Sequence, residues 1–378
     1  MKTIIITTTI NIPVFLESYI RNFKEYDIDP DRVTLLIVGD MKSPHEHIKK
    51  YIKNLNSDYP IEYWDVKSQR NWIAEHFPHR EDEVNLAIPY NSIRRRNFAY
   101  LRTLELDAKF IISVDDDNYA GESNWLSEHV KTLDSNTLPA ITSRSRVVNP
   151  CEILEFRCPY KIYPRGFPIS KTFLDDISIK FERSNSVLNL GLWIKSPDVD
   201  AYTNLLYPEL ESFGLKEASY PTYTLAGENY MPINTQNTSF KRELVIPFYC
   251  LLMDTKINGL PINRYDDIWA GLFTLKLIHR IGDHATFGSP LTVHQRNKHD
   301  YISDFKSELL GMVLNDRVWS TVMNIDIHSR SYVDGYIELL DKFSMDIRKV
   351  VNNDEVLRYF DKMHKASRIW VSLCEEFS

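Results

Sequence analysis

Three consecutive aspartates, Asp115, Asp116 and Asp117, follow the apolar run 110–114 and are the side chains of this chain best suited to chemistry. An apolar run is readily buried in a sheet, whereas adjacent carboxylates are costly to bury unpaired, so we expect the strand to end there. The carboxyl edge of an open α/β sheet is where ligands bind. Carboxylates at this edge suit Mg²⁺ or Mn²⁺, which also bind substrate phosphates. The pattern therefore predicts a divalent-cation site with Asp115 and Asp117 as ligands, although a solvated acidic turn would look the same.

Two further carboxylates, Asp266 and Asp267, stand at the start of a predicted helix. A helix N-terminus favours negative charge, so N-capping would account for one of them. An acidic site apart from the metal could also act as a general base, or orient a hydroxyl group of a substrate. His294 follows the short run 291–293, where its imidazole could complete the metal site or have a purely structural role.

Polar residues at the ends of the first two predicted strands could contact a nucleoside. Thr8 lies near the end of the first strand, and Asp40 follows the second, where it could equally be a turn aspartate after Gly39. The arginines 94–96 stand early in a later helix, and bidentate geometry favours arginine for phosphate. We take Arg95 as the one that faces a phosphate, and expect the other two to be solvated or in ion pairs.

Strands and helices alternate in the first part of the chain, which predicts a parallel, Rossmann-like sheet. The strands are expected at 3–9, 33–38, 61–66 and 110–114, and the helices at 14–23, 44–55 and 92–106. No GxGxxG follows the first strand, so the usual dinucleotide site is not indicated. Residues 138–237 are irregular and typical of binding loops. Further helices are expected at 268–281, 302–318, 332–350 and 354–377.

The composition of the chain limits the classes of protein to which it can belong. The 378 residues are 43% hydrophobic and 12% aromatic, with a net charge of −7, so a packed core is expected. No sustained basic block is present, which speaks against nucleic acid as a partner. The four cysteines form neither metal-binding pairs nor a dense disulfide framework, so we predict reduced thiols. Without a signal-peptide pattern or an apolar run of about 20 residues, we predict a cytoplasmic protein with no transmembrane segment, at most peripheral at a membrane.

Several motifs together resemble those of the reversibly glycosylated polypeptides, the family that includes the plant UDP-arabinopyranose mutases. The likeness rests on the triplet 115–117, Arg165-Gly166-Phe167-Pro168, Gly191-Leu192-Trp193, Pro197-Asp198, Asp200-Ala201, Asn237, Phe240, Arg242-Glu243-Leu244, the run Arg-Tyr-Asp-Asp-Ile-Trp-Ala-Gly at 264–271, and His294. It covers most of the first 300 residues, and we expect no counterpart beyond about residue 300.

The resemblance implies a GT-A (Rossmann-like) fold, a bound Mn²⁺ or Mg²⁺, a UDP-sugar ligand and self-association into a homo-oligomer. It assigns the aspartate triplet to metal and nucleotide, with Asp115 and Asp116 near the nucleotide. Arg165 occupies the position that becomes reversibly glycosylated in the family. Plant members carry a second arginine seven residues later, where this chain has Thr172. A guanidinium stays protonated and is a poor nucleophile, so Arg165 could instead bind the diphosphate or a sugar carboxylate.

We therefore hypothesise a metal-dependent glycosyltransferase that moves a sugar from a UDP-sugar to a carbohydrate or glycoconjugate acceptor. Arg165 would face the donor, and Asp266 or Asp267 would act as base or acceptor anchor. Residues 1–300 would form the GT-A domain and 301–378 a helical C-terminal extension that packs on it or binds a partner. Two alternatives remain: a mutase that interconverts the pyranose and furanose forms of a UDP-sugar with self-glycosylation, and a non-catalytic nucleotide-sugar-binding subunit.

Overall fold

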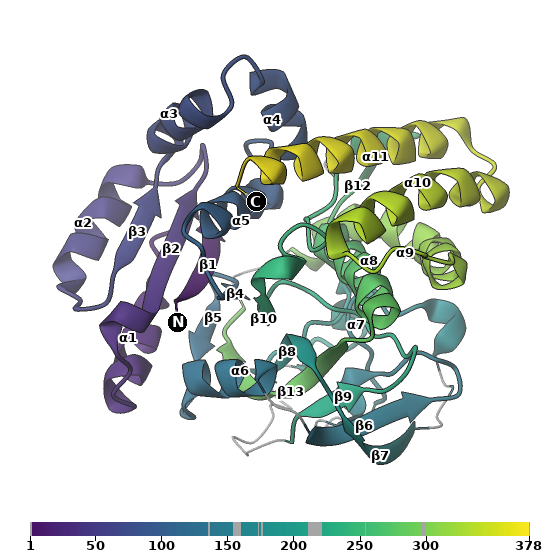
Figure 1. Ribbon diagram of the computed structural model, residues 1–378, viewed down its shortest axis with the longest axis horizontal. Helices are drawn as coiled ribbons and strands as arrows, with labels where there is room; N and C mark the ends of the chain where they lie inside the picture. Colours follow the sequence, from purple (N-terminus) through teal and green to yellow (C-terminus); the bar gives the residue numbers. More distant parts are fainter. Residues whose placement is uncertain are drawn as a thin grey trace.

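The computed structural model describes residues 2–134, 137–153, 160–172, 174, 177–210, 221–253, 255–296 and 300–377. Its central feature is a mixed β-sheet flanked by helices (Figure 1). Four parallel strands form one side of the sheet, in the order β3 (Ile61–Trp64), β2 (Val33–Gly39), β1 (Thr3–Thr9) and β4 (Phe110–Val114). Since parallel strands end at the same edge, the residues that follow β1, β2 and β4 are brought together.

The sheet continues beyond β4 with mixed strand directions. Its further order is β10 (Asn237–Lys241), β8 (Ser186–Lys195), β13 (His284–His294), β9 (Tyr223–Leu225), β6 (Thr137–Ser143) and β7 (Ile177–Arg183). The short strand β5 (Asn118–Ala120) pairs with the end of β13, and β11 (Thr255–Ile257) and β12 (Leu260–Ile262) form a separate hairpin. The irregular region expected at 138–237 therefore also supplies strands to the sheet.

The helices of the first half are α1 (Leu16–Glu25), α2 (His45–Leu55), α3 (Val66–His76), α4 (Glu81–Ala87), α5 (Arg96–Glu105) and α6 (Trp125–Leu133). Those of the second half are α7 (Ala201–Leu206), α8 (Asp266–Ile281), α9 (Tyr301–Asn324), α10 (Tyr332–Val350) and α11 (Asp354–Cys374). Short 3₁₀ turns include η2 (Ile93–Arg95) and η4 (Ile169–Lys171).

The parallel strands separate two apolar clusters, because side chains alternate between the faces of a strand. Ile4 and Ile6 of β1 pack into the larger cluster, whereas Ile5 packs against α1 in the smaller one. Strands buried on both faces explain the nearly continuous apolar runs that made them predictable.

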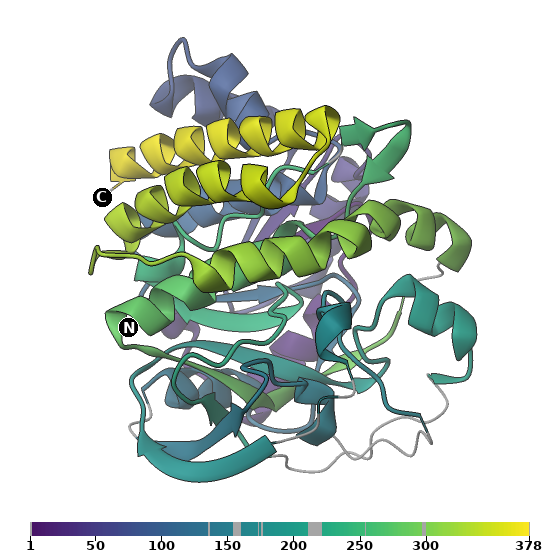
Figure 2. The same ribbon diagram turned by 90° about the vertical axis from the view of Figure 1, so that its right-hand side faces the viewer.

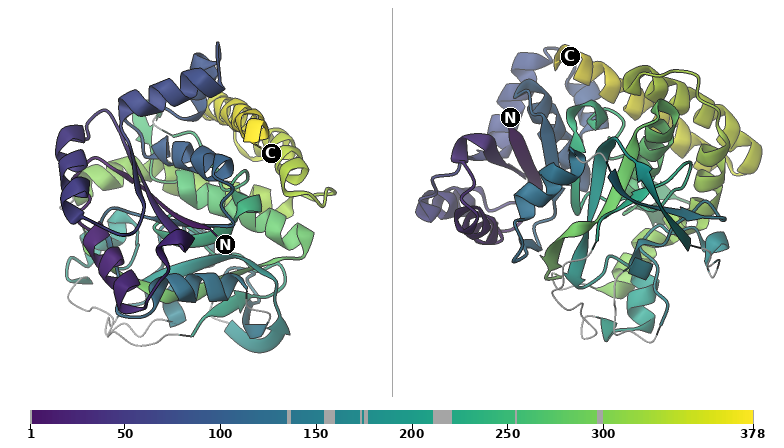
Figure 3. Two further views of the ribbon diagram at one scale, coloured as in Figure 1. Left: turned by 60° about the vertical axis from the view of Figure 1, so that its left-hand side comes forward. Right: turned by 60° about the horizontal axis from the view of Figure 1, so that its bottom comes forward.

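The C-terminal helices belong to the larger cluster. Helices α9, α10 and α11 run side by side (Figure 2), and they lie on the opposite side of the molecule from the purple N-terminal helices (Figure 3). Trp370 of α11 donates its indole N–H to the carbonyl of Ile246 at 2.9 Å, and Tyr359 donates to the carbonyl of Leu252 at 2.7 Å. These helices therefore share the core of the preceding chain, while the predicted domain boundary at residue 300 stays a prediction.

The prediction of an α/β fold with C-terminal helices is confirmed, and most element boundaries agree within a few residues. The strands predicted at 3–9 and 110–114 are β1 and β4 with the same bounds. The prediction of a strand to residue 66 was wrong, because Asp65 accepts a hydrogen bond from the Ser68 N–H and caps α3. Helices α3 and α4 were not predicted. Within the described residues, no helix has the length and apolarity needed to cross a bilayer.

Candidate functional site

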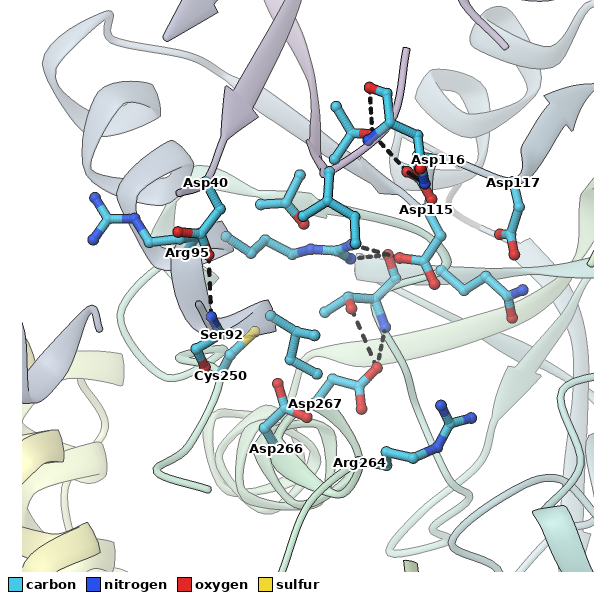
Figure 4. Close-up of a pocket in the computed structure, with 18 of the residues that line it drawn as sticks. Asp40, Ser92, Arg95, Asp115, Asp116, Asp117, Cys250, Arg264, Asp266 and Asp267 are labelled. Atoms are coloured by element: carbon cyan, nitrogen blue, oxygen red, sulfur yellow. Dashed lines mark hydrogen bonds and ion pairs between the residues drawn. The ribbon is translucent and has the colours of Figure 1, made fainter. Parts of the chain in front are cut away.

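A cavity of about 470 Å³ opens at the carboxyl ends of β1, β2 and β4 (Figure 4). Every residue predicted from the sequence to form a site lines it: Thr8, Asp40, Arg95, Asp115, Asp116, Asp117, Arg165, Asp266, Asp267 and His294. The aspartate triplet therefore borders a cleft and is not a turn in bulk solvent. The sheet topology is the cause, since it gathers segments that are up to several hundred positions apart.

Asp117 and His294 face each other because of the register between β5 and β13. His294 pairs with Asn118, the residue after Asp117, and its Nε2 lies 3.5 Å from Asp117 Oδ2. On the other side of the ring, Nδ1 is 2.7 Å from the carbonyl of Ser196. This contact orients the ring so that Nε2 is directed at the carboxylate of Asp117. Two electron-pair donors at this distance are stabilised by a proton or a cation between them.

Asp115 lies beside the same corner of the cavity but has a protein partner. Its Oδ1 accepts a hydrogen bond from Arg96 Nη2 at 2.5 Å. Burial raises the pKa of Asp115, the positive charge of Arg96 opposes that rise, and the charge of Asp117 adds to it. Arg96 in turn holds the strand end, since its Nη1 donates to the Ser113 hydroxyl and to the carbonyl of Thr235.

Asp116 points in a different direction from its two neighbours. Its Oδ2 accepts hydrogen bonds from the Thr9 hydroxyl at 2.6 Å and from the Asn11 amide at 3.4 Å. Burial raises the pKa of this carboxyl group. Asp116 thus ties the end of β4 to the loop after β1, and it lines the cavity beside that loop.

The side chains present fit a hard divalent cation in chemistry but only partly in geometry. Asp115, Asp117 and His294 offer carboxylate oxygen and imidazole nitrogen, the ligand types that Mn²⁺ accepts. Among the described residues, no three His, Cys, Asp or Glu side chains are gathered closely enough to hold an ion by themselves. A cation that binds one or two protein carboxylates and takes its remaining ligands from phosphate and water fits such a site.

Asp40 and the neighbouring arginines form the opposite side of the cavity. Both carboxylate oxygens of Asp40 accept backbone N–H groups, from Asn91 at 2.9 Å and from Ser92 at 3.1 Å. Arg95 is fully buried, donates to Gln69 and to the carbonyl of Ile88, and stacks on Tyr90. Burial lowers the pKa of Arg95 to about 10.

Two of the three arginines were expected to be solvated or in ion pairs, and Arg96 is indeed in an ion pair, with Asp115. None of the arginines 94–96 is solvated, because each has a side chain buried to 6% exposure or less. The 3₁₀ turn η2 precedes α5, and the arginine that reaches the aspartate triplet is Arg96 and not Arg95.

Arg165 is held in a buried network of ion pairs. Its Nε and Nη2 donate to the two oxygens of Asp198, each at 3.2 Å, and its Nη1 donates to the carbonyl of Arg264. Asp267 Oδ1 lies 3.6 Å from Nη1. Burial alone would lower the pKa of Arg165, but the charges of Asp198, Asp267 and Glu308 raise it well above its usual value. The guanidinium is therefore fixed in place and protonated.

The two aspartates of α8 differ in what they hold. Asp267 Oδ2 accepts from both the N–H and the hydroxyl of Thr235, and its Oδ1 accepts from the N–H of Ile268. Asp266 is 1% exposed and lies in the cavity wall beside Cys250. Burial raises the pKa of the Cys250 thiol, and the charge of Asp266 raises it further, so this thiol stays protonated.

Several lining residues were missing from the predicted site. They include Thr9, Asn11, Arg96, Asp198, Gln236, Arg264 and Arg296. Two had a signal in the sequence: Asp198 belongs to the Pro-Asp motif, and Arg296 lies two positions after His294 along the chain. Arg264 begins the run 264–271, but nothing in the sequence indicated that Asp198 and Arg264 would pair with Arg165, because the three residues are remote from one another along the chain.

Two expectations remain, one about the cysteines and one about position 172. Cys151, Cys250 and Cys374 are buried, whereas Cys158 lies outside the described residues. Thr172 follows η4, where its hydroxyl donates to the carbonyl of Ile169, and it does not line the cavity.

The fold and the cavity define an α/β protein with a cavity at the carboxyl edge of its parallel strands, lined by carboxylates and guanidinium groups, at the place where open α/β sheets bind ligands. The chain belongs to the reversibly glycosylated polypeptide family, whose model matches residues 80–378. This match confirms the resemblance seen in the sequence. It also shows that the expectation of no counterpart after residue 300 was wrong.

Several curated relatives share one enzyme name, UDP-arabinopyranose mutase. A probable UDP-arabinopyranose mutase 4 of Arabidopsis thaliana is 25% identical over 279 residues, which are 71% of this chain and 68% of the relative. UDP-arabinopyranose mutase 1 of the same plant is 24% identical, over 71% and 70% of the two chains. A probable UDP-arabinopyranose mutase 1 of Pisum sativum is 26% identical, over 71% and 68%. The prediction of an enzyme agrees with these relatives.

Solved structures with a similar course of the chain are glycosyltransferases. The mannosyltransferase PcManGT of Pyrobaculum calidifontis, in complex with GDP-Man and Mn²⁺, has a TM-score of 0.41 and 10% identity, over 100% of this chain and 84% of that one. The TarS 1-349 protein of S. aureus, in complex with UDP-GlcNAc, has a TM-score of 0.37 and 11% identity, over 99% and 91%. Likeness at this level says nothing about activity.

Proposed function

We propose that this protein is a metal-dependent glycosyltransferase that uses a nucleotide sugar, a UDP-sugar in our reading, as its donor. The observation that carries the proposal is the corner where Asp117 and His294 face each other at 3.5 Å beside Asp115, at the edge of a 470 Å³ cavity. The names of the curated relatives supply the choice of a UDP-sugar.

In this proposal Asp115, Asp117 and His294 would hold Mn²⁺ or Mg²⁺, which supplies positive charge to the diphosphate when the glycosidic bond breaks. Thr8, Asp40 and Arg95 would border the nucleoside, and Asp116 would fix the loop after β1 beside it. The nucleoside would then lie on the side of Asp40, and the sugar would extend toward Arg264 and the start of α8, which face Asp40 from across the cavity in Figure 4.

Arg165 takes an electrostatic role in this scheme. Its guanidinium is protonated and bound to Asp198, so it has no lone pair with which to attack a sugar. Asp267 holds Thr235 and the first turn of α8, which makes it a positioning residue. We assign the role of base or acceptor anchor to Asp266, and a carbohydrate or glycoconjugate as the acceptor.

Calorimetry with UDP and MnCl₂ tests the proposal. We expect wild-type protein to bind UDP with Mn²⁺ and to bind it much more weakly when the metal is chelated. Asp117→Ala should lose the metal-dependent part, whereas Asp361→Ala, on the exposed face of α11, should bind like wild type. Equal affinity of wild type and Asp117→Ala in the presence of Mn²⁺ would remove the metal site.

A mutase is the second candidate, favoured by the names of the relatives. Two observations weigh against a route through a glycosylated arginine: Arg165 is held in ion pairs, and Thr172 lies away from the cavity wall. Incubation with UDP-arabinopyranose and Mn²⁺, followed by chromatography, decides between the two. A UDP-arabinofuranose peak formed without acceptor would favour the mutase.

A non-catalytic subunit remains the third candidate. It would bind UDP-sugar without hydrolysis, transfer or isomerisation across a panel of donors. A cytoplasmic location and a homo-oligomer stay predictions, and gel filtration with light scattering checks the second.

A further inference from the structure

We infer that one face of α9, centred on Glu308, is a positioning element of the cavity. This inference rests on the proposed function, because it concerns the side of the cavity that we assign to the sugar. It goes beyond that function in placing part of the active-site support in a helix where the sequence indicated only an extension.

Four residues of α9 share the face that meets the site. Asp304, Glu308, Gly311 and Asn315 are spaced by four, three and four positions, so they lie in one row on the helix. Each of them contacts a segment that carries cavity residues. A helix that merely covered the core would present apolar side chains in this row.

Glu308 is the most deeply buried of the four, at 0% exposure. Its Oε1 accepts from Arg264 Nε at 2.7 Å, and its Oε2 accepts from the N–H of Ala201 at 2.7 Å. A buried carboxylate is costly unless it is paired and hydrogen-bonded. Both oxygens therefore have a partner, and both partners are held in place by the same carboxylate.

Arg264 depends on such support because of its backbone. Its φ of +65° is in the left-handed region, which costs a residue other than glycine roughly 1–2 kcal/mol. In this conformation its carbonyl accepts a hydrogen bond from Arg165 Nη1. A chain of direct contacts thus runs from Glu308 through Arg264 to Arg165, and Asp304 adds a weaker pair with Arg264 at 3.6 Å.

Further along α9, Gly311 and Asn315 contact two segments of the site, the one that contains Gly166 and the first turns of α8. Asn315 accepts from the indole of Trp269 at 3.0 Å and donates to the carbonyl of Gly166 at 2.8 Å. Gly311 packs against Tyr265 so closely that a Cβ there would collide with the ring. One helix face therefore holds both the residues after Arg165 and the residues around Asp266.

The position of these contacts predicts that a change in α9 lowers turnover of the sugar donor but leaves nucleotide binding unchanged. Arg264 lies across the cavity from Asp40 and Arg95 (Figure 4). Loosening it should leave the nucleotide side intact while it displaces the groups beside the sugar. A misplacement of about 1 Å can cost roughly 100-fold in rate.

The test compares Glu308→Gln with Asp341→Asn, a matched change in α10 whose carboxylate pairs with His364. We expect Glu308→Gln to bind UDP with Mn²⁺ like wild type, and to release UDP from UDP-arabinopyranose or UDP-glucose with kcat lowered about tenfold or more. Asp341→Asn should match wild type in both. Unchanged kcat for Glu308→Gln would overturn the inference. If Glu308→Gln does not fold, Asp304→Asn should show a smaller loss in kcat, and its absence would overturn the inference.

A double-mutant cycle with Arg264→Gln adds a readout that does not need turnover. If Glu308 acts through Arg264, the urea midpoint of the double variant should be no lower than that of Arg264→Gln alone, because Glu308→Gln removes the buried charge that Arg264→Gln leaves unpaired. Additive midpoint shifts would overturn the inference. Failure of wild-type protein to bind UDP with Mn²⁺ would instead remove the proposed function, so the two failures are distinguishable.

Discussion

The two sides of the cavity treat their charged groups differently. Around Asp117, a carboxylate and an imidazole face each other with only 3.5 Å between them, and a cation would complete the arrangement. Around Arg165, the guanidinium already has the carboxylates of Asp198 and Asp267 as ion-pair partners. The comparison suggests that the first side is built to gain a charge with the ligand, and the second to keep its geometry when the ligand arrives.

The largest expected difference between the two sides is in stability. Asp198→Ala leaves the buried Arg165 charge without its main partner, which should lower the free energy of unfolding by about 3–5 kcal/mol. Asp117→Ala removes one of several adjacent like charges and should cost about 1 kcal/mol or less. Urea denaturation measures both, and equal costs would contradict the comparison.

Addition of UDP and Mn²⁺ should reverse the order of the two sides, because only the side around Asp117 gains stability from the bound cation. UDP with Mn²⁺ at about 100 times its dissociation constant should raise the free energy of unfolding of wild type by about 2.7 kcal/mol. Asp117→Ala should gain nothing, because it lacks a ligand of the cation. Thermal or urea unfolding with and without UDP and MnCl₂ checks this, with Asp361→Ala as the control. Stabilisation of Asp117→Ala to the wild-type extent would show that the cation binds elsewhere.

A smaller effect concerns pH. Burial raises the pKa of Asp198, but the charges of Arg165 and Arg296 and the hydrogen bonds from Arg165 and Asn234 together lower it below the usual 3.8. A carboxyl group with a depressed pKa in the folded state stabilises fully above its unfolded pKa, and this contribution is lost as the pH falls through the folded value. Wild type and Asp198→Asn should therefore differ most above about pH 5 and converge as the pH falls through the folded-state pKa of Asp198, which lies below 3.8. A gap that widens on acidification would refute the pairing.

The smallest expected effect is at position 172. Thr172→Arg restores the arginine found in plant members, but at a position that does not line the cavity. We expect no measurable change in UDP affinity or in the products formed from UDP-arabinopyranose. New furanose product in this variant would move the mutase ahead of the transferase.

The sequence sufficed for the side of the cavity that the parallel strands build. Apolar runs that end in Asp40 and Asp115 locate one edge of a sheet, and the motif that ends in His294 adds the last strand. Which arginine faces the triplet was not predictable, because η2 changes the direction of the side chains before α5 begins.

The side of the cavity around Arg165 could be predicted from the sequence only in part. Arg165 was found by resemblance, and Asp266 and Asp267 by their place at the start of a predicted helix. The contacts that hold this side come from Asp198, Arg264 and a helix beyond residue 300. Contacts between such distant segments leave no local pattern. The row of polar residues on α9 interrupts an amphipathic sequence that otherwise reads as ordinary core packing.

The place of Glu308 in the chain has a consequence for biosynthesis. The aspartate triplet leaves the ribosome nearly two hundred residues before α9, whereas His294 and Glu308 follow within fifteen residues of each other. A growing chain therefore completes its candidate cation ligands and the support of Arg264 at almost the same point of translation, and a chain terminated before α9 would lack both this support and part of the core.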